Sequence, residues 1–271
     1  MTPAAAIRSV VCDVDGTLVD HEKRLSVGTI EAVRRVRAAG IGFTVISARP
    51  PSGVEPIADA LDLDGLIAAF NGGTLFRRGG EVVSERLVPA EVGRGVLKLA
   101  RGSGAHVWVF ADRRWHADTL DDPHVPRERR SANQEPVVLS DFGDLADRAN
   151  KITLVSDEPA VLEPLLERAR GRYAHQATIA QSQSYFLDVT ALQANKGAGV
   201  EALARAAGLP LESVMALGDM RNDLPMLTCA GLAVAMGQAP DDVRAAAHWL
   251  TASNDEDGVA RALDRLLAER G

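Results

Sequence analysis

The sequence predicts an α/β fold in which a parallel sheet core carries an inserted α+β domain. Near both ends of the chain, short β-rich runs alternate with helical patterns, and this order is typical of a parallel sheet with right-handed crossovers. Between residues 81 and 188, strand and helix patterns occur without that alternation. We therefore expect residues 1–80 and 189–271 to form the core and residues 81–188 to form the insertion.

The first third of the core predicts three strands separated by two helices. Ser26 is typical of a helix N-cap, and Gly40 supplies a C-terminal stop for the helix between them. A second helix is expected at 52–61. The predicted strands are 8–12, 42–46 and 66–70.

The last third of the chain repeats this pattern. Asn195 is expected to cap a helix that runs to about residue 207, and Asn222 to cap a short helix with Pro225 in its first turn. The expected strands are 214–217 and 232–236, and the expected final helices are about 240–247 and 257–268.

The insertion has strand patterns of a different kind. Residues 106–110 and 113–117 indicate a hairpin, and further strands are expected at 151–156 and within 179–189. Trp108 and Trp115 lie in the hairpin, and we interpret them as core residues, with a place in a substrate pocket as the alternative.

Composition excludes several classes of protein. The net charge of −7 disfavours a nucleic-acid binder, and aromatic residues at 4% disfavour a base-stacking surface. Two cysteines in apolar surroundings do not form a disulfide scaffold and suggest a reducing compartment. We find neither a membrane span nor a secretory leader in the sequence, so we expect a cytoplasmic protein. Lysine is scarce, with four residues against 26 arginines, so a lysine within a motif calls for a reason.

Polar residues gather where the predicted strands end. Ligands of open parallel sheets bind at the carboxyl ends of the strands. These ends are followed by Asp13 and Asp15, by Ser47, and by Asp219, Asn222 and Asp223, while Lys196 opens a helix near the same edge. The sequence therefore predicts one polar site from distant segments.

Carboxylates in this number suit a hard cation such as Mg²⁺, which takes oxygen ligands together with substrate phosphate. One carboxylate beside a phosphoryl group can attack phosphorus, and a second can protonate the leaving alkoxide and later deprotonate water. Each piece also has a structural interpretation. Asp-x-Asp-Gly is a common turn, and Asn222 and Asp223 can cap a helix.

The combined motifs resemble those of the haloacid dehalogenase superfamily. They are Asp13-Val14-Asp15-Gly16-Thr17-Leu18, Ser47, Asn195-Lys196-Gly197 and Gly218-Asp219-x-x-Asn222-Asp223. The chain length, the position of the insertion and the stretch 233–237 resemble the Cof-type phosphatases with a type C2B cap, which implies a Rossmann-like core.

The resemblance implies a role for each motif residue. Asp13 would be the nucleophile and Asp15 the general acid and base. Ser47 and Lys196 would be phosphate ligands, and Asn222 would help to orient the phosphate or its loop. Mg²⁺ would be held by Asp13, Asp15 through its backbone carbonyl, and Asp219, with Asp223 in support. This chain departs from the family pattern at Ala48, where Gly is usual, and at Gln238, where Asn is usual.

From these features we expect a Mg²⁺-dependent phosphatase of small phosphorylated metabolites, either sugar phosphates or phosphorylated cofactors, with the insertion as a lid that selects the substrate. A phosphosugar mutase of the same superfamily and a non-catalytic phosphosugar-binding regulator are the alternatives. We expect no nucleic-acid or membrane partner, and the sequence leaves the oligomeric state open, with a weak homodimer as one possibility.

Overall fold

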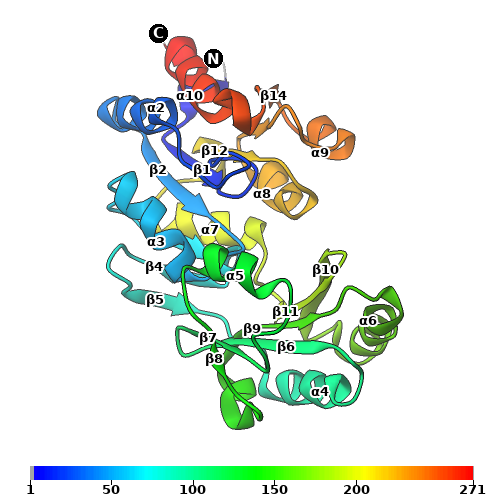
Figure 1. Cartoon of the computed structure of the whole chain (residues 1–271). Coiled ribbons are helices and arrows are strands. Elements are labelled where there is room, and N and C mark those ends of the chain that lie inside the picture. The colour runs from blue at the N-terminus through cyan, green and yellow to red at the C-terminus, as the bar shows by residue number, and fades with distance from the viewer. Residues whose placement is uncertain (1–2, 271) are drawn as a thin grey trace. The chain divides into compact units, whose positions relative to one another are not determined.

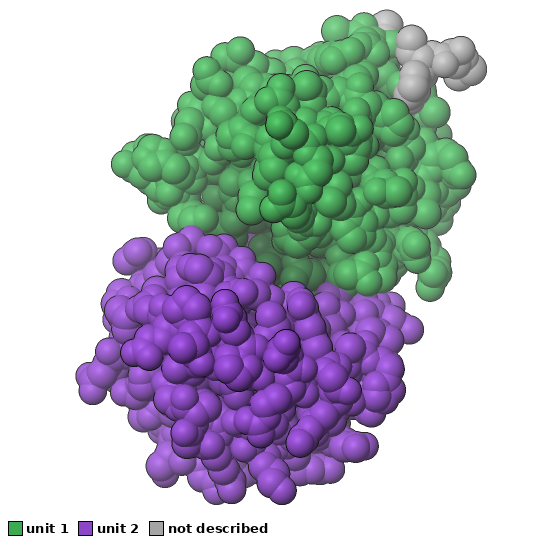
Figure 2. Space-filling view, turned by 90° about the vertical axis from the view of Figure 1, so that its right-hand side faces the viewer, with its two compact units in different colours: residues 1–48, 55–82, 195–271 green, residues 49–54, 83–194 purple. Residues whose placement is uncertain are grey.

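The computed structural model describes residues 3–270, and the chain divides into two compact units. Unit 1 comprises residues 1–48, 55–82 and 195–271, and unit 2 comprises residues 49–54 and 83–194. Figure 2 colours the two units separately. Unit 2 thus continues beyond residue 188, because its last strand runs on to Ala191.

Unit 1 is built on the predicted parallel sheet (Figure 1). The order of the eight strands is β14-β13-β12-β1-β2-β3-β4-β5. Neighbours from β14 to β3 pair in parallel, and β4 runs antiparallel to β3. The strands are β1 (Ser9–Asp13), β2 (Gly42–Ile46), β3 (Ile67–Ala69), β4 (Thr74–Phe76), β5 (Val82–Glu85), β12 (Val214–Gly218), β13 (Leu232–Ala235) and β14 (Trp249–Leu250). Residues 83–85 of β5 already belong to unit 2.

Helices connect these strands, and two of the predicted N-caps are confirmed. The side chain of Ser26 accepts a hydrogen bond from the N–H of Thr29, and that of Asn195 accepts one from Ala198, each at 3.0 Å. The helices are α1 (Pro3–Ala6), α2 (Val27–Ala38), α3 (Pro51–Ala60), α7 (Lys196–Ala206), α8 (Leu224–Cys229), α9 (Asp241–Ala245) and α10 (Gly258–Arg270). Within residues 3–270, none of the helices has the length and apolar composition that a bilayer crossing requires.

The core of unit 1 lies between the sheet and its helices. Helix α2 packs on α10, and α7 packs on α8 (Figure 1). One apolar cluster joins Val200 and Leu203 of α7 to strand residues such as Val11 and Ala216. Residues 10–13 of β1 are all buried, so both faces of this central strand are covered, as is usual in parallel sheets.

Unit 2 is an α+β fold with its own sheet, in the order β10-β11-β9-β6-β7-β8. The strands pair antiparallel except for β7 and β8. The elements are α4 (Ala90–Ala100), β6 (His106–Ala111), β7 (Arg114–Ala117), α5 (Val125–Ala132), β8 (Val137–Val138), β9 (Ala149–Val155), α6 (Pro159–Tyr173), β10 (Ala177–Gln183) and β11 (Phe186–Ala191).

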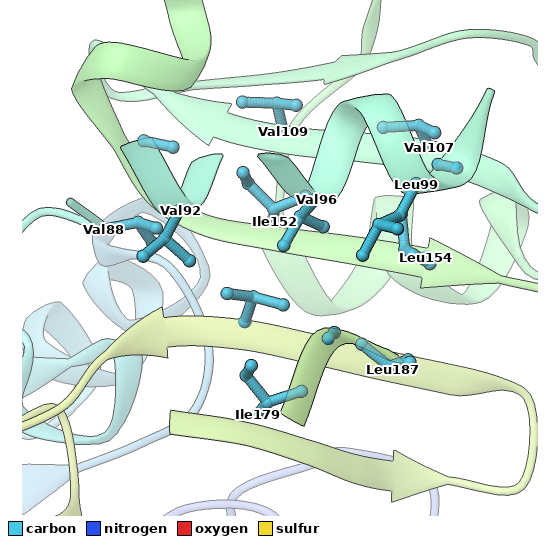
Figure 3. Packing of buried hydrophobic residues seen from close by; sticks show 14 of the residues in the cluster. Val88, Val92, Val96, Leu99, Val107, Val109, Ile152, Leu154, Ile179 and Leu187 are labelled. Carbon is cyan, nitrogen blue, oxygen red and sulfur yellow. The ribbon is translucent and has the colours of Figure 1, made fainter. Parts of the chain in front are cut away.

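A separate apolar cluster stabilises unit 2. Figure 3 shows Val92, Val96 and Leu99 of α4 beside Ile152 and Leu154 of β9. Every residue of this cluster belongs to unit 2. Trp108 and Trp115 are also buried, and their rings meet edge to face at 5.1 Å. They are therefore core residues, as expected.

Two local predictions were wrong. Strand β3 ends at Ala69 because Phe70 and Asn71 adopt left-handed backbone conformations, with φ of 47° and 56°. Asn222 does not cap a helix: it lies inside a 3₁₀ turn, Arg221–Asp223, and Asp223 is the N-cap of α8.

The separate clusters predict that the two units lose stability independently. Ile152→Ala should lower the free energy of unfolding of unit 2 by about 2–5 kcal/mol, because it leaves a cavity in that cluster. Leu263→Ala in the buried face of α10 should weaken unit 1 to a similar extent. Hydrogen exchange of peptides from each unit measures both effects. Equal loss of protection in both units for either variant would contradict the prediction.

Candidate active site

The predicted site residues lie at the point where the strand order changes direction. After β1 the chain adds β2 and β3 on one side, and β12, β13 and β14 lie on the other side. The loops that follow β1 and β12 therefore separate and leave room for a ligand between them. Asp13 is the last residue of β1, and Asp219 follows the last residue of β12.

A buried lysine connects three of the predicted motifs. Lys196 is the first residue of α7, and its side chain is 1% exposed. Its Nζ lies 2.5 Å from Oδ1 of Asp13 and 2.5 Å from Oδ1 of Asp223. The ammonium thus joins β1, α7 and the turn after β12 by two charge-assisted hydrogen bonds.

Asp223 uses its second oxygen to shape the loop that carries Asp219. Oδ2 of Asp223 accepts hydrogen bonds from the backbone N–H groups of Asp219, at 2.8 Å, and Met220, at 2.9 Å. Both carboxylate oxygens of Asp223 are therefore engaged within the protein, which is the arrangement of a supporting residue.

Asp219 is held by the first motif. The hydroxyl of Thr17 donates a hydrogen bond to Oδ1 of Asp219 at 3.0 Å. Burial and the nearby charge of Asp223 raise the pKa of Asp219 to about 6, although the Thr17 hydrogen bond acts in the opposite direction. The charged form of the Asp219 carboxyl is thus disfavoured unless a cation is nearby.

The charges at this site do not balance within the protein. Burial is the largest cause that raises the pKa of Asp13 well above its usual range, and the charge of Asp223 is the next largest. Lys196 opposes this shift. Burial disfavours the charged form of Lys196, but the carboxylates of Asp13 and Asp223 more than offset it and raise the pKa of Lys196. Three carboxylates therefore face one ammonium, which leaves a net negative charge.

Ser47 is also fixed at this edge. It follows β2 and is fully buried. Its N–H donates to the carbonyl of Ala68 at 2.9 Å, and its own carbonyl accepts from the N–H of Asn71 at 2.7 Å. The left-handed turn at 70–71, which follows the adjoining strand β3, therefore holds the backbone of the second motif in place.

The structure brings the predicted residues together to different degrees. The side chains of Asp13, Asp219 and Asp223 offer oxygen atoms that all lie within 4.8 Å of one another, and Lys196 contacts two of them. Asp15 lies in the loop after β1, where its Oδ1 is 2.6 Å from Nζ of Lys23. Asn222 lies in the 3₁₀ turn and is exposed.

Sequence reasoning assigned no role to three residues that shape this site. Thr17 orders Asp219, and Lys23 contacts Asp15. The amide of Gln238 donates to the carbonyl of Gly16 at 2.5 Å, so the glutamine in place of the usual Asn anchors the loop. The scarcity of lysine was a signal for Lys23, whereas the contacts of Thr17 and Gln238 join segments that are more than 200 residues apart.

Known proteins share this fold over almost the whole chain. A Haemophilus influenzae protein that is named as a phosphatase, without a substrate, is 31% identical in sequence to this chain. The match covers 97% of this chain and 99% of that protein. The crystal structure of a haloacid dehalogenase-like hydrolase from Bacteroides thetaiotaomicron has a TM-score of 0.89 and 30% identity, covering 96% of this chain and 99% of that one. A structure described as a haloacid dehalogenase subclass IIB sugar phosphatase has a TM-score of 0.81 and 26% identity, with coverage of 95% and 98%.

The match to a protein family also covers almost the whole chain. Residues 10–263 match the family of haloacid dehalogenase-like hydrolases, a range that includes the four predicted motifs and unit 2. The chain therefore belongs to the haloacid dehalogenase-like hydrolases and is a phosphatase of their Cof type.

Proposed function

We propose that this phosphatase hydrolyses small phosphorylated metabolites through an aspartyl-phosphate intermediate with Mg²⁺. The observation that carries the proposal is the buried carboxylate of Asp13, held at the end of β1 by Lys196 and crowded by Asp219 and Asp223. A carboxylate fixed in this way has few conformations to lose before it attacks phosphorus.

In the first half-reaction an oxygen of Asp13 forms a bond to phosphorus as the bond to the leaving-group oxygen breaks. Asp15 donates its proton to that oxygen, so the leaving group departs as a neutral alcohol. An ammonium has three N–H donors, and two of those of Lys196 are directed to Asp13 and Asp223, so one remains for a phosphoryl oxygen. The hydroxyl of Ser47 is a second phosphate ligand in this proposal.

In the second half-reaction water attacks the phosphorus of the aspartyl phosphate. Asp15, now a carboxylate, takes a proton from that water, the bond between phosphorus and Asp13 breaks, and inorganic phosphate leaves. Each proton that Asp15 donates in the first half is therefore recovered in the second, and the enzyme returns to its starting state.

The acidic residues fit a magnesium ion. Carboxylate oxygens are the ligands that Mg²⁺ prefers, and the net negative charge of the site calls for a cation before a phosphate dianion enters. We propose that Asp13, Asp219 and the backbone carbonyl of Asp15 hold the ion, with Asp223 supporting Asp219. When bound, the ion supplies charge neutralisation of the phosphoryl oxygens.

Sugar phosphates and phosphorylated cofactors are the proposed substrate classes. One solved relative is a sugar phosphatase, and a Bacillus subtilis relative, 25% identical over 97% of this chain, is a 5-amino-6-(5-phospho-D-ribitylamino)uracil phosphatase. We propose that unit 2 selects the leaving group. The separate apolar core of unit 2 supports this proposal. Release of one phosphate for each substrate consumed separates hydrolysis from the mutase alternative.

Asp13→Asn should abolish phosphate release and leave the fold intact, because the amide keeps the shape of the side chain but cannot attack phosphorus. The measurement is inorganic phosphate released from p-nitrophenyl phosphate and from a panel of sugar phosphates and phosphorylated cofactors, for the wild type and the variant. Circular dichroism is the control for folding. Comparable turnover by purified Asp13→Asn would refute the nucleophile, and a wild type that hydrolyses none of these esters would refute the proposed function.

Mg²⁺ should be required for turnover and should also stabilise the protein, because it binds the folded site and relieves the repulsion there. At a concentration of about 100 times its dissociation constant, we expect a rise in melting temperature of about 5 °C. Asp219→Asn should lose most of that rise, and Ca²⁺ should support turnover poorly. Full activity after exhaustive chelation would remove the metal from the mechanism.

Gly16→Ala should displace Asp219 from the site. Gly16 has a φ of +82°, and an added Cβ would lie 2.4 Å from Oδ2 of Asp219. Gly79→Ala is a matched control, since Gly79 has a φ of +89° with no atom within 4 Å of the added Cβ. Both variants introduce backbone strain of roughly 1 kcal/mol, but only Gly16→Ala should lower kcat/KM, by about 10²-fold. Equal activity in both variants would show that the close approach has no role.

A further inference from the structure

We propose that helix α5 positions the phosphate ligand Ser47, because the chain just beyond the second motif is hydrogen-bonded to the end of that helix. This inference rests on the proposed function, in which Ser47 binds the phosphoryl group. Residues 1–48 belong to unit 1 and residues 49–54 to unit 2, so the boundary between the units falls directly after this motif. Helix α3 therefore starts in unit 2 and ends in unit 1.

The first turn of α3 has a carbonyl without its usual helical partner. Pro56 lies inside the helix and has no N–H, so the carbonyl of Ser52, four residues earlier, receives no hydrogen bond from within the helix. The side-chain amide of Asn133 donates to this carbonyl at 3.3 Å. The proline thus leaves an acceptor that a residue next to α5 takes up.

The end of α5 has the complementary need. The helix ends at Ala132, and the last carbonyl groups of a helix lack donors within it. The hydroxyl of Ser52 donates to the carbonyl of Ala132 at 2.6 Å. Asn133 follows with a φ of 50°, a left-handed conformation that asparagine tolerates well. The two helices therefore satisfy each other's carbonyl groups through Ser52 and Asn133.

A glycine allows the two helices to approach at this point. Gly53 is buried, and an added Cβ would lie 2.1 Å from the carbonyl oxygen of Ser131 and 3.2 Å from Cα of Ala132. Both of these are backbone atoms, so a larger residue at 53 requires one helix to move. Two hydrogen bonds and a close backbone approach thus hold the start of α3 against the end of α5.

This contact lies five residues beyond Ser47. The side chain of Arg49 donates to the carbonyl of Gly53 at 3.1 Å, so the short segment between the motif and the contact is held together. A shift at the end of α5 therefore changes the direction in which the chain leaves Ser47, and with it the position of the hydroxyl. A displacement of about 1 Å in a binding group can lower a rate about 10²-fold.

Gly53→Ala tests the contact, because the added methyl group separates α3 from α5. We expect kcat/KM for p-nitrophenyl phosphate to fall about tenfold and Ki for inorganic phosphate to rise by a similar factor, since this inhibitor occupies the phosphoryl site without a leaving group. Gly65→Ala is a matched control, because no atom lies within 4 Å of its added Cβ. It should change neither value by more than about twofold.

A double-mutant cycle separates positioning of Ser47 from a general weakening of the fold. In a Ser47→Ala protein, Gly53→Ala should lower kcat/KM by less than about twofold, because the group whose position it disturbs is already absent.

Asn133→Gly is a second variant, which suits the left-handed backbone but removes the amide donor. It should lower kcat/KM about threefold, and only where Ser47 is present. It carries the test where Gly53→Ala does not fold, and melting temperatures of all variants show whether the fold is kept.

Equal losses from Gly53→Ala, or from Asn133→Gly, with and without Ser47 would overturn the inference while the phosphatase function stands. An unchanged Ki for inorganic phosphate, or the same loss for Gly65→Ala, would overturn it as well. A wild type that hydrolyses neither p-nitrophenyl phosphate nor any ester of the metabolite panel would overturn the proposed function, so the two failures are distinguishable.

Discussion

The buried ammonium of Lys196 is the interaction on which the site depends. It pairs with Asp13 and Asp223 at 2.5 Å each, and so fixes the end of β1, the start of α7 and the turn after β12 relative to one another. Loss of the lysine would leave the buried carboxylates of Asp13 and Asp223 without a counter-charge, which costs about 3–5 kcal/mol in such networks. Glycine at 199 serves this geometry, because a Cβ there would lie 2.5 Å from Cδ1 of Ile46 and 2.9 Å from the backbone Cα of Gly72.

One ammonium does not neutralise three carboxylates, so the carboxylates repel one another in the folded protein. Binding of a cation can relieve this repulsion. The pKa of Asp219 rises from 3.8 to about 6, which means that the folded state holds this proton more tightly than the unfolded chain does. Its contribution to stability is therefore present below pH 3.8 and is lost as the pH rises through about 6. At neutral pH the repulsion at this site opposes folding, and the cation that we propose there would restore stability.

The elements that the sequence predicted well are those with local causes. The parallel strands follow from apolar runs, and the starts of α2 and α7 follow from Ser26 and Asn195, whose side chains cap the next turn. Strands β4 and β14 have three and two residues, which is too short for a periodic pattern. The polar residues at the ends of the predicted strands indicated the candidate site, but the contacts of Gln238 depend on how distant loops pack.

The loop between Gly16 and Arg24 contacts two carboxylates of the candidate site in different ways. Its first residue approaches Asp219, which fixes a carboxylate with little freedom, and its last turn carries Lys23 to Asp15. Asp13 and Asp219 are buried, as suits the nucleophile and the ion ligand that we propose, whereas Asp15 is partly exposed and contacts the flexible side chain of Lys23. A group that must both give and take a proton in each turnover needs that access to water, so the difference in burial matches the difference in proposed role.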